Sequence, residues 1–390
     1  LQPDVMTSQG RTPVGVILSG GFAQYMLLDE QILSRQYGPF AYPVEGLDYG
    51  SVAVSEPWAC VERTYRASRR LAPREGGRML IRFCRALSNS SAMDRQYRLL
   101  SDVRPSRIDL VGDVSSQAPL IADLNRSGAI VRTLPAPDSV PYDDIVLLDP
   151  DPAEIADSFS FLAAGGLLCI CSNKESVEAG VPVGRVHYES IGIVGTTTLD
   201  IESAYEDNHR CELAEGGALW VAGAGGPMGQ MHVLRALEQE SGPTVVVATN
   251  RGAERVEHLR NRFEPLAAAK GKRFIAFSPA QTGLSSLAML QSQTGFSAFT
   301  DAVVVAANAD LMQEALAAVG PSGVVALFGG LPPKTIVPLR LDGLIRRKVN
   351  LTGTSGSSLD DQKRVLSVSA QGALRANMVI SAAAGVGPVR

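Results

Sequence analysis

The chain has 390 residues, of which 19% are charged, and its formal net charge is -4. This balance gives no general electrostatic footprint for nucleic acid, and the arginines between Arg63 and Arg85 are better explained as a solvated face than as a basic patch. No apolar run approaches the roughly 20 residues that span a bilayer, and the first residues lack the pattern of a secretion signal. We therefore expect a cytoplasmic protein of about two or three domains that binds a small molecule and neither nucleic acid nor a membrane.

The cysteines and histidines show no metal-ligand spacing. None of the five cysteines forms the C-x-x-C pair of a structural zinc site. Cys169 and Cys171 lie in an apolar run that is typical of a buried strand, so we interpret the thiols as small buried apolar groups. The four histidines are scattered, and His232 is expected on the surface or in the packing of a helix.

The first 65 residues contain short apolar runs separated by turn residues. Residues 14–18 and 22–28 predict strands of a small β-rich domain, although there is too little chain here for a self-contained core. In residues 49–65 the apolar residues recur at helical spacing. We predict a helix there that leads into the next unit.

The remainder of the chain repeats one pattern twice. Apolar runs alternate with helical segments in each copy, which predicts a parallel sheet covered on both faces. Three strand candidates of the first copy match three of the second at almost equal spacing, as expected for an internal repeat. The matched runs are 143–148 with 300–305, 166–170 with 323–327, and 191–196 with 349–354.

The first copy lacks a glycine-rich turn. Its first strand candidate, residues 78–84, is followed by residues 85–90 without glycine, so a pyrophosphate could not approach that backbone closely. Asp113 ends the second strand candidate, 107–113, where a ribose-binding acid would stand, although a turn residue is the plainer explanation. We therefore assign the first copy a structural role.

The second copy opens with a glycine-rich turn between a strand candidate and an apolar-periodic helix candidate. Glycines allow a tight turn and let the backbone approach a pyrophosphate, whose charge lies at the N-terminus of the helix. The strand before and the helix after favour a nucleotide site over a merely structural turn. The residues assigned to it are Gly223, Gly225, Gly226, Pro227, Met228 and Gly229.

The second strand candidate of this copy, residues 244–249, is followed by Asn250 and Arg251. An NAD site usually places an acid here for the ribose 2′-hydroxyl, whereas an NADP site accommodates a neutral residue and an arginine. The pair therefore favours NADP over NAD. The alternative is that Arg251 is only a solvated residue at the start of a helix.

Three short runs and the glycine-rich turn carry a family resemblance. The runs are G-G-F-A-Q-Y-M at 20–26, P-V-E-G-L at 43–47 and E-P-W-A-C-V at 56–61. They resemble the medium-chain dehydrogenase/reductase family, the zinc-type alcohol and polyol dehydrogenases. The run G-A-G-G-P-M-G-Q-M-H at 223–232 is similar to the branch that includes sorbose 1-phosphate reductase. The family's G-H-E segment and zinc-binding cysteines are absent from this sequence, so we expect either a fragment of a longer protein or a pared-down GroES-like domain.

The resemblance implies an α/β fold of two tandem Rossmann-like doubly wound parallel sheets, the first degenerate, after a remnant of the β-rich GroES-like domain. The expected boundaries are 1–55 for the remnant, 56–205 for the degenerate unit and 206–390 for the dinucleotide-binding unit. Ala306 and Ala307 would face the cofactor, and Gly329 would lie near the nicotinamide.

The resemblance also implies how the sheets associate. Members of the family join their nucleotide-domain sheets edge to edge, and an unpaired sheet edge invites association. We therefore expect either a homodimer or an intramolecular pseudo-dimer of the two copies. The pairing would run through the strands near Cys169 and Leu327.

Glu56 is the one candidate for catalysis and for metal binding. In polyol-type relatives the equivalent glutamate lies beside the catalytic zinc, but zinc needs about three protein ligands, and a plain helix-start glutamate is the alternative. The sequence thus predicts an NAD(P)-dependent oxidoreductase that transfers a hydride between the cofactor and a sugar, polyol or sugar-phosphate alcohol or ketone. The alternative function is a non-catalytic dinucleotide-binding sensor or scaffold derived from such a dehydrogenase.

Overall fold

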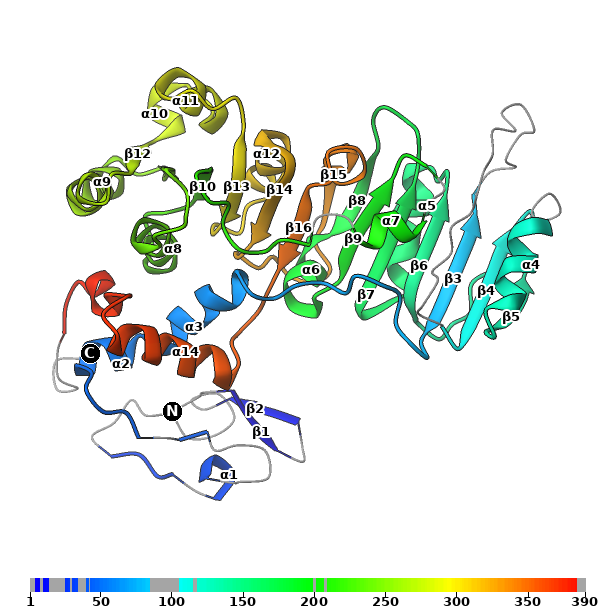
Figure 1. The fold of residues 1–390 in the computed structure, drawn as a ribbon, viewed down its shortest axis with the longest axis horizontal. Helices are drawn as coiled ribbons and strands as arrows, with labels where there is room; N and C mark the ends of the chain where they lie inside the picture. The colour runs from blue at the N-terminus through cyan, green and yellow to red at the C-terminus, as the bar shows by residue number, and fades with distance from the viewer. Residues whose placement is uncertain are drawn as a thin grey trace.

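The structure is a computed structural model that describes residues 4–7, 10–13, 25–28, 30–33, 40–41, 43–84, 105–114, 118–198, 201–206 and 209–383. Two six-stranded parallel sheets with helices packed against them form two Rossmann-like units in tandem (Figure 1). We call them the first unit, whose sheet lies within residues 78–196, and the second unit, whose sheet lies within residues 218–353. The predicted α/β fold is confirmed.

The sheet of the second unit is parallel throughout. Its strands are β10 (Ala218–Ala222), β11 (Val245–Thr249), β12 (Arg273–Phe277), β13 (Phe299–Val304), β14 (Val319–Leu327) and β16 (Asn350–Gly353). They lie in the order β12-β11-β10-β13-β14-β16. Every residue of β10 and β11 is buried, because helices cover both faces of a parallel sheet, and this explains the continuous apolar runs.

The sheet of the first unit repeats this arrangement. Its strands are β3 (Arg78–Phe83), β4 (Arg107–Gly112), β5 (Ile130–Leu134), β6 (Tyr142–Leu148), β7 (Leu162–Cys171) and β9 (Gly192–Thr196). Their order, β5-β4-β3-β6-β7-β9, is the same as in the second unit, position by position. All three pairs of matched strand candidates are strands at equivalent places, so the predicted internal repeat is confirmed.

Each unit also carries the same buried ion pair beside its first strand. In the first unit Arg70 Nη1 lies 3.2 Å from Asp144 Oδ2, and in the second Arg210 Nη1 lies 2.5 Å from Asp301 Oδ1. The backbone N–H four residues after each arginine donates to the same carboxylate, at 2.9 and 3.0 Å. Both aspartates are buried. The repeat therefore extends into the segment that leads into each sheet.

A short antiparallel ladder joins the two units. It pairs β8 (Glu178–Pro182) of the first unit with β15 (Ile336–Arg340) of the second. One hydrophobic core runs through both units and includes Val181 and Leu339 from this ladder. Helices α6 (Val183–Glu189) and α13 (Asp342–Ile345) follow the two strands.

The predicted pairing through the strands near Cys169 and Leu327 is wrong. These residues lie in β7 and β14, and each of these strands is flanked on both sides by strands of its own sheet. Their backbone groups are already used within the sheet, so neither strand can pair across the junction. The strands that face the junction are β9 and β16, the last strands of their sheets.

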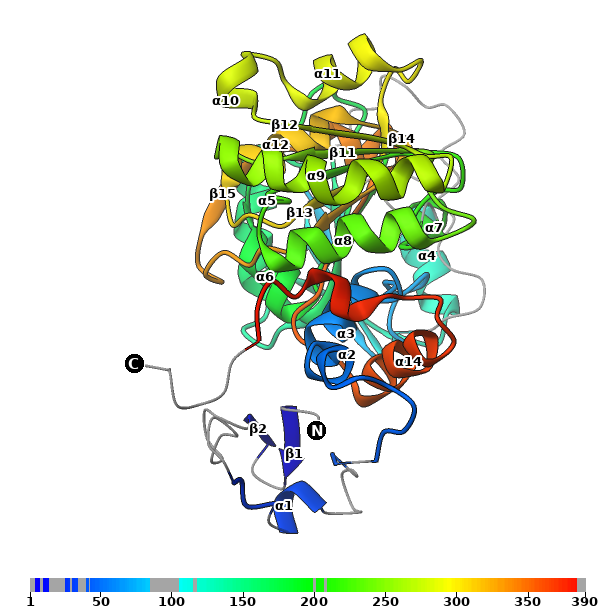
Figure 2. The same cartoon turned by 90° about the vertical axis from the view of Figure 1, so that its left-hand side faces the viewer.

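Four helices form a layer on one side of the second unit. Figure 2 shows α9 (Ala253–Ala269), α8 (Pro227–Glu238), α3 (Ser55–Thr64) and α14 (Leu359–Ala370) one below another. The predicted helix over 49–65 is present as α2 (Tyr49–Ala53) and α3, with a break at Val54. Although the expected boundaries place α3 in the first unit, it packs against α8 and α14 of the second. The remaining helices are α1 (Glu30–Leu33), α4 (Ala118–Arg126), α5 (Pro152–Ser158), α7 (Ile201–Glu206), α10 (Pro279–Thr282), α11 (Ser286–Gln293) and α12 (Ala309–Ala318), with 3-10 helices Phe159–Phe161 and Ala376–Val379.

The N-terminal segment contains one antiparallel pair, β1 (Asp4–Thr7) with β2 (Gly10–Pro13). The predicted strand 14–18 and the start of the predicted strand 22–28 lie outside the described residues. Residues 25–28 have no regular structure, so the strand prediction is wrong there. Within the described ranges, no helix is long and apolar enough to cross a membrane.

Candidate functional site

The glycine-rich turn connects β10 to α8, and Gly226 is the N-cap residue of the helix. Gly223 has a φ of 88°, a left-handed value that favours glycine. A side chain at Gly223 would also bring its Cβ within 2.9 Å of the Cβ of Ala306. The tight turn therefore requires glycine here for both its backbone and its packing.

The last glycine of the turn sets the packing of the helix. A Cβ at Gly229 would lie 2.5 Å from the Cα of Ala224, so glycine lets α8 approach the end of β10 closely. Pro227 is the first helical residue, where its missing N–H costs no hydrogen bond. Met228, on the first turn of the same helix, is half-buried and packs against the hydrophobic core.

Gly226 differs from the other glycines of the turn. A Cβ built on it would meet no atom within 4 Å. The space beside it lies at the N-terminus of a helix of 12 residues, whose first N–H groups have no partners within the helix. An anion that approaches Gly226 would meet these donors and the positive end of the helix dipole.

Asn250 lies directly against the turn. A Cβ at Gly225 would come within 2.8 Å of the Asn250 side chain and 2.9 Å of the Cβ of Arg255. In the amide orientation that satisfies both of its polar atoms, the Asn250 oxygen accepts from the N–H of Gly252 at 3.1 Å. Arg251 and Arg255 are exposed. The sequence analysis missed Arg255, which brings a second cation to this end of the turn.

The ends of β13 and β14 complete the same edge of the sheet. The N–H groups of Val305 and Ala306 donate to the carbonyl of Ala222 at 2.9 and 3.3 Å. A Cβ at Gly329 would lie 2.5 Å from the carbonyl oxygen of Val305 and 2.8 Å from the N of Ala307. The predicted residues Ala306, Ala307 and Gly329 therefore lie together beside the glycine turn, at the carboxyl ends of the strands.

The first unit reaches this edge through α6. The Nδ1 of His187 is hydrogen-bonded to the carbonyl of Leu327, at 3.1 Å. A Cβ at Gly330 would lie 2.6 Å from the hydroxyl of Tyr188. Tyr188 is 50% exposed, so its hydroxyl is accessible beside the end of β14. No pattern in the sequence marks these two residues, because the contact joins two units that fold from distant segments.

Glu56 lies in the first turn of α3. Its Oε1 accepts hydrogen bonds from the Ser357 hydroxyl at 3.2 Å and the Cys60 thiol at 3.3 Å. In the part of the chain that the structure describes, no three His, Cys, Asp or Glu side chains come together to hold a metal ion. The described residues do not form a zinc site, and the catalytic and metal-binding roles of Glu56 stay predictions.

A buried polar network attaches α3 to α8. The hydroxyl of Tyr65 lies 2.6 Å from Nδ1 of His232, and the guanidinium of Arg235 lies 4.0 Å from the centre of the Tyr65 ring. Arg235 donates to Glu62 at 2.6 Å and to Glu212 at 2.8 Å. The prediction that His232 lies on the surface or in helix packing is resolved in favour of packing, since its side chain is fully buried. The network holds the helix whose N-terminus carries Gly226.

His232 should make the stability of the protein depend on pH. Burial lowers its pKa from 6.5 to about 3, so below neutral pH the unfolded chain binds a proton that the folded chain does not. The free energy of unfolding should therefore fall by about 2 kcal/mol between about pH 7 and about pH 5 through this residue. The substitution His232→Gln, which can still accept from Tyr65, should flatten this dependence in urea titrations. An unchanged slope would contradict the assignment.

Similar proteins match this chain over less than half of its length. No known protein family matches the sequence. It is 27% identical over 188 residues to the uncharacterized protein YggP of Escherichia coli, covering 47% of this chain and 44% of that protein. It is 26% identical over 183 residues to a mannitol-1-phosphate 5-dehydrogenase of Aliivibrio fischeri, covering 46% of this chain and 42% of that enzyme. The chain thus matches less than half the length of these curated relatives.

Among solved structures, the similar chains include a butanediol dehydrogenase and an alcohol dehydrogenase. One is 2R,3R-butanediol dehydrogenase from Bacillus subtilis, 20% identical, with a TM-score of 0.34 and coverage of 43% of each chain. Another is an alcohol dehydrogenase from Thermus sp. ATN1, 23% identical, with a TM-score of 0.35, covering 44% of this chain and 46% of that one. The match covers less than half of each of these dehydrogenases.

Proposed function

We propose that the chain binds NADP or NAD in its second unit and belongs to an oxidoreductase that acts on an alcohol or ketone group. The observation that carries this proposal is the open space at Gly226, beside the N-terminus of α8 and among the carboxyl ends of β10, β11, β13 and β14. In open α/β sheets, dinucleotides bind at this edge, where the strand order reverses. The fit is specific to one position, because a Cβ at Gly223, Gly225 or Gly229 would meet packed atoms, whereas a Cβ at Gly226 would meet none within 4 Å.

Different residues around the turn are assigned to different parts of the cofactor. In this proposal the pyrophosphate lies against Gly226 and the first turn of α8, and the adenosine ribose lies against Asn250. Arg251 and Arg255 are then available for a 2′-phosphate, and Ala306, Ala307 and Gly329 line the nicotinamide end. When bound, the cofactor accepts or donates the hydride. The Tyr188 hydroxyl of the first unit lies beside Gly330 at that end, and we infer that it helps to exclude water there.

The proposed substrate is a sugar, a polyol or a sugar phosphate. Support comes from the partial similarity to a mannitol-1-phosphate 5-dehydrogenase and from the resemblance of residues 223–232 to the branch that includes sorbose 1-phosphate reductase.

A second candidate is a non-catalytic dinucleotide-binding sensor or scaffold. The engagement of Glu56 Oε1 by Ser357 and Cys60 favours it, because an oxygen that already accepts two hydrogen bonds is less available to a substrate. The two candidates differ in one assay. An oxidoreductase should reduce NADP+ or NAD+ when mixed with a panel of polyols and sugar phosphates, with metal content measured in parallel, whereas a sensor should bind the cofactor without turnover.

The choice between NADP and NAD is tested at Asn250. Titration of the protein with NADPH and NADH, followed by nucleotide fluorescence, should show tighter binding of NADPH. The substitution Asn250→Asp keeps the acceptor for Gly252 N–H and adds the acid that binds a ribose 2′-hydroxyl, so the NADPH to NADH affinity ratio should fall about tenfold. An unchanged affinity ratio would show that Asn250 does not contact the ribose. If neither nucleotide binds, the proposed function is rejected.

A further inference from the structure

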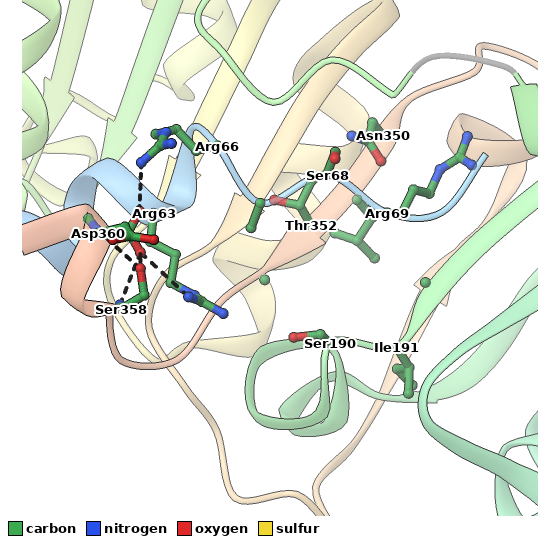
Figure 3. Close-up of a pocket in the computed structure, with 15 residues that line it drawn as sticks. Arg63, Arg66, Ser68, Arg69, Ser190, Ile191, Asn350, Thr352, Ser358 and Asp360 are labelled. Carbon is green, nitrogen blue, oxygen red and sulfur yellow. Dashed lines mark hydrogen bonds and ion pairs between the residues drawn. The ribbon is translucent and has the colours of Figure 1, made fainter. Parts of the chain in front are cut away.

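A second hollow lies where the two units meet, away from the glycine turn. It is a cavity of about 530 Å³, within the range of about 300–1,000 Å³ that is usual for small-molecule sites. Its walls come from the end of α3 and the segment after it, the start of α14, β16, and the residues just before β9 (Figure 3). None of the residues assigned to the candidate cofactor site lines it.

Three arginines line this cavity. Figure 3 shows Arg63 and Arg66 at one end, near Ser358, and Arg69 at the other, near Asn350. Arg63 and Arg66 share one carboxylate, that of Asp361, at 3.5 and 2.9 Å. Arg63 donates to Oδ2 of Asp361 and Arg66 donates to Oδ1, while Oδ2 also accepts from Ser358 within the N-terminal cap of α14. Each guanidinium group is therefore bound to this carboxylate through one nitrogen. The remaining N–H donors of these side chains can serve an anion.

The exposure of the arginines agrees with a ligand site. The side chains of Arg63 and Arg66 are 37% and 45% exposed, whereas that of Asp361 is 7% exposed. The carboxylate is therefore fixed in the protein, while the guanidinium groups can turn toward the cavity. Guanidinium groups bind phosphate through paired, charge-assisted hydrogen bonds.

Neutral polar groups line the rest of the cavity. Ser68, Ser190, Asn350 and Thr352 contribute hydroxyl and amide groups, and Asp360 adds an exposed carboxylate. The hydroxyl of Thr352 is buried and has no hydrogen-bond partner within the described part of the chain.

Ser190 has the left-handed φ of 52°, which a residue other than glycine adopts only at a cost. It lies at the end of α6, directly before β9. The fold thus maintains an unfavourable backbone conformation at the point where the first unit contributes to the cavity wall.

We propose that this cavity binds a small phosphorylated molecule that carries hydroxyl groups, at a site separate from the dinucleotide site. The phosphate accepts from guanidinium N–H groups of Arg63 and Arg66 that Asp361 does not use, and the hydroxyl groups lie against Asp360 and Ser190. Because both units and α3 form the walls, the bound molecule contacts the first unit and the second at once. The proposal does not depend on the proposed function, since it uses none of the cofactor-binding residues.

Calorimetric titration of the whole protein tests this site. The probes are glucose 6-phosphate, inorganic phosphate and glucose. Glucose 6-phosphate should bind saturably and more tightly than inorganic phosphate, and glucose should bind weakly. The substitution Arg66→Gln should lower the affinity for glucose 6-phosphate about tenfold, through the loss of charge-assisted hydrogen bonds.

Arg364→Gln is the matched control. Arg364 lies on α14, is 53% exposed and does not line the cavity, so this variant removes the same charge nearby without touching the site. It should leave binding unchanged. Arg63→Gln provides a second test at the phosphate end, with the same expected loss of affinity, if Arg66→Gln alters the fold, which thermal unfolding will show.

Gly226→Asp separates this site from the dinucleotide site. Glucose 6-phosphate binding should survive Gly226→Asp and be weakened by Arg66→Gln. The reverse pattern would show that the phosphate occupies the glycine turn, and it would overturn the proposal. Equal binding of glucose and glucose 6-phosphate, or no saturable binding of either phosphate compound, would overturn it as well.

Discussion

Gly226→Asp is expected to abolish the fluorescence enhancement that NADPH or NADH shows on binding. Gly226 faces open space at the start of α8, so the new side chain enters the volume assigned to the pyrophosphate. Its carboxylate would repel the phosphate charge and would occupy the N–H groups that the phosphate needs. We expect at least an approximately 100-fold loss of affinity, measured by nucleotide fluorescence titration.

The fold should tolerate this change. A Cβ at Gly226 meets no atom within 4 Å, and its φ of -88° is an ordinary value for any residue. An aspartate is moreover a good N-cap residue. Gly226→Ala, which adds bulk without charge, is the control and should lose much less affinity. Unchanged nucleotide binding by Gly226→Asp, in a protein with an unaltered unfolding transition, would remove the cofactor site from this turn.

The features that the sequence predicts well are local in the chain. The runs at 218–222 and 245–249 are buried at every residue, and a strand buried on both faces has no polar position to interrupt its pattern. Gly223 and Gly229 are also readable, because their constraints arise within a single turn between adjacent elements. Spacing between such strands was enough to predict the internal repeat.

The features that the sequence does not predict join distant residues. Arg70 with Asp144 and Arg210 with Asp301 form equivalent ion pairs, yet a charged pair far apart in the chain leaves no periodic signal. The strand β15 has Pro338 at its centre and pairs only with β8, so its apolar alternation is short and ambiguous. The edge pairing was inferred from the family resemblance and not from a residue pattern, and it was placed at strands that lie inside their sheets.

The residues of the candidate sites also fall into these two groups, local and distant. Asn250 was identified because it directly follows a strand, whereas Arg255 lies one helical turn later and looks like any exposed arginine. Tyr188 and the cavity at the junction depend on the packing of one unit against the other. The arginines of the cavity were interpreted as a solvated face. Arg63 and Arg66 are partly exposed, as a solvated face requires, but the interpretation misses that the arginines line one cavity.

Arg235→Leu is expected to lower the free energy of unfolding by about 3–5 kcal/mol, the usual cost of removing one partner of a buried ion pair. Arg235 Nε lies 2.6 Å from Glu62, and both side chains are about one-tenth exposed or less. The substitution leaves Glu62 buried, with its remaining cation, Arg364, at 3.9 Å. The transition to follow is urea unfolding, with NADPH titration as the functional readout, since α3 then loses the charged part of its polar attachment to α8.

A second variant tests whether the lower stability comes from the unpaired charge of Glu62 or from lost packing. The double substitution Glu62→Leu with Arg235→Leu removes both buried charges, and it should recover a large part of the stability because an apolar pair of similar volume can replace a buried ion pair. Arg260→Leu, at an exposed position on α9, is the control and should change stability by less than about 1 kcal/mol. If the double variant is no more stable than Arg235→Leu, then the stacking of Arg235 on Tyr65 and not the buried charge of Glu62 governs this contact. The attachment of α3 to α8 would then be mainly an aromatic one.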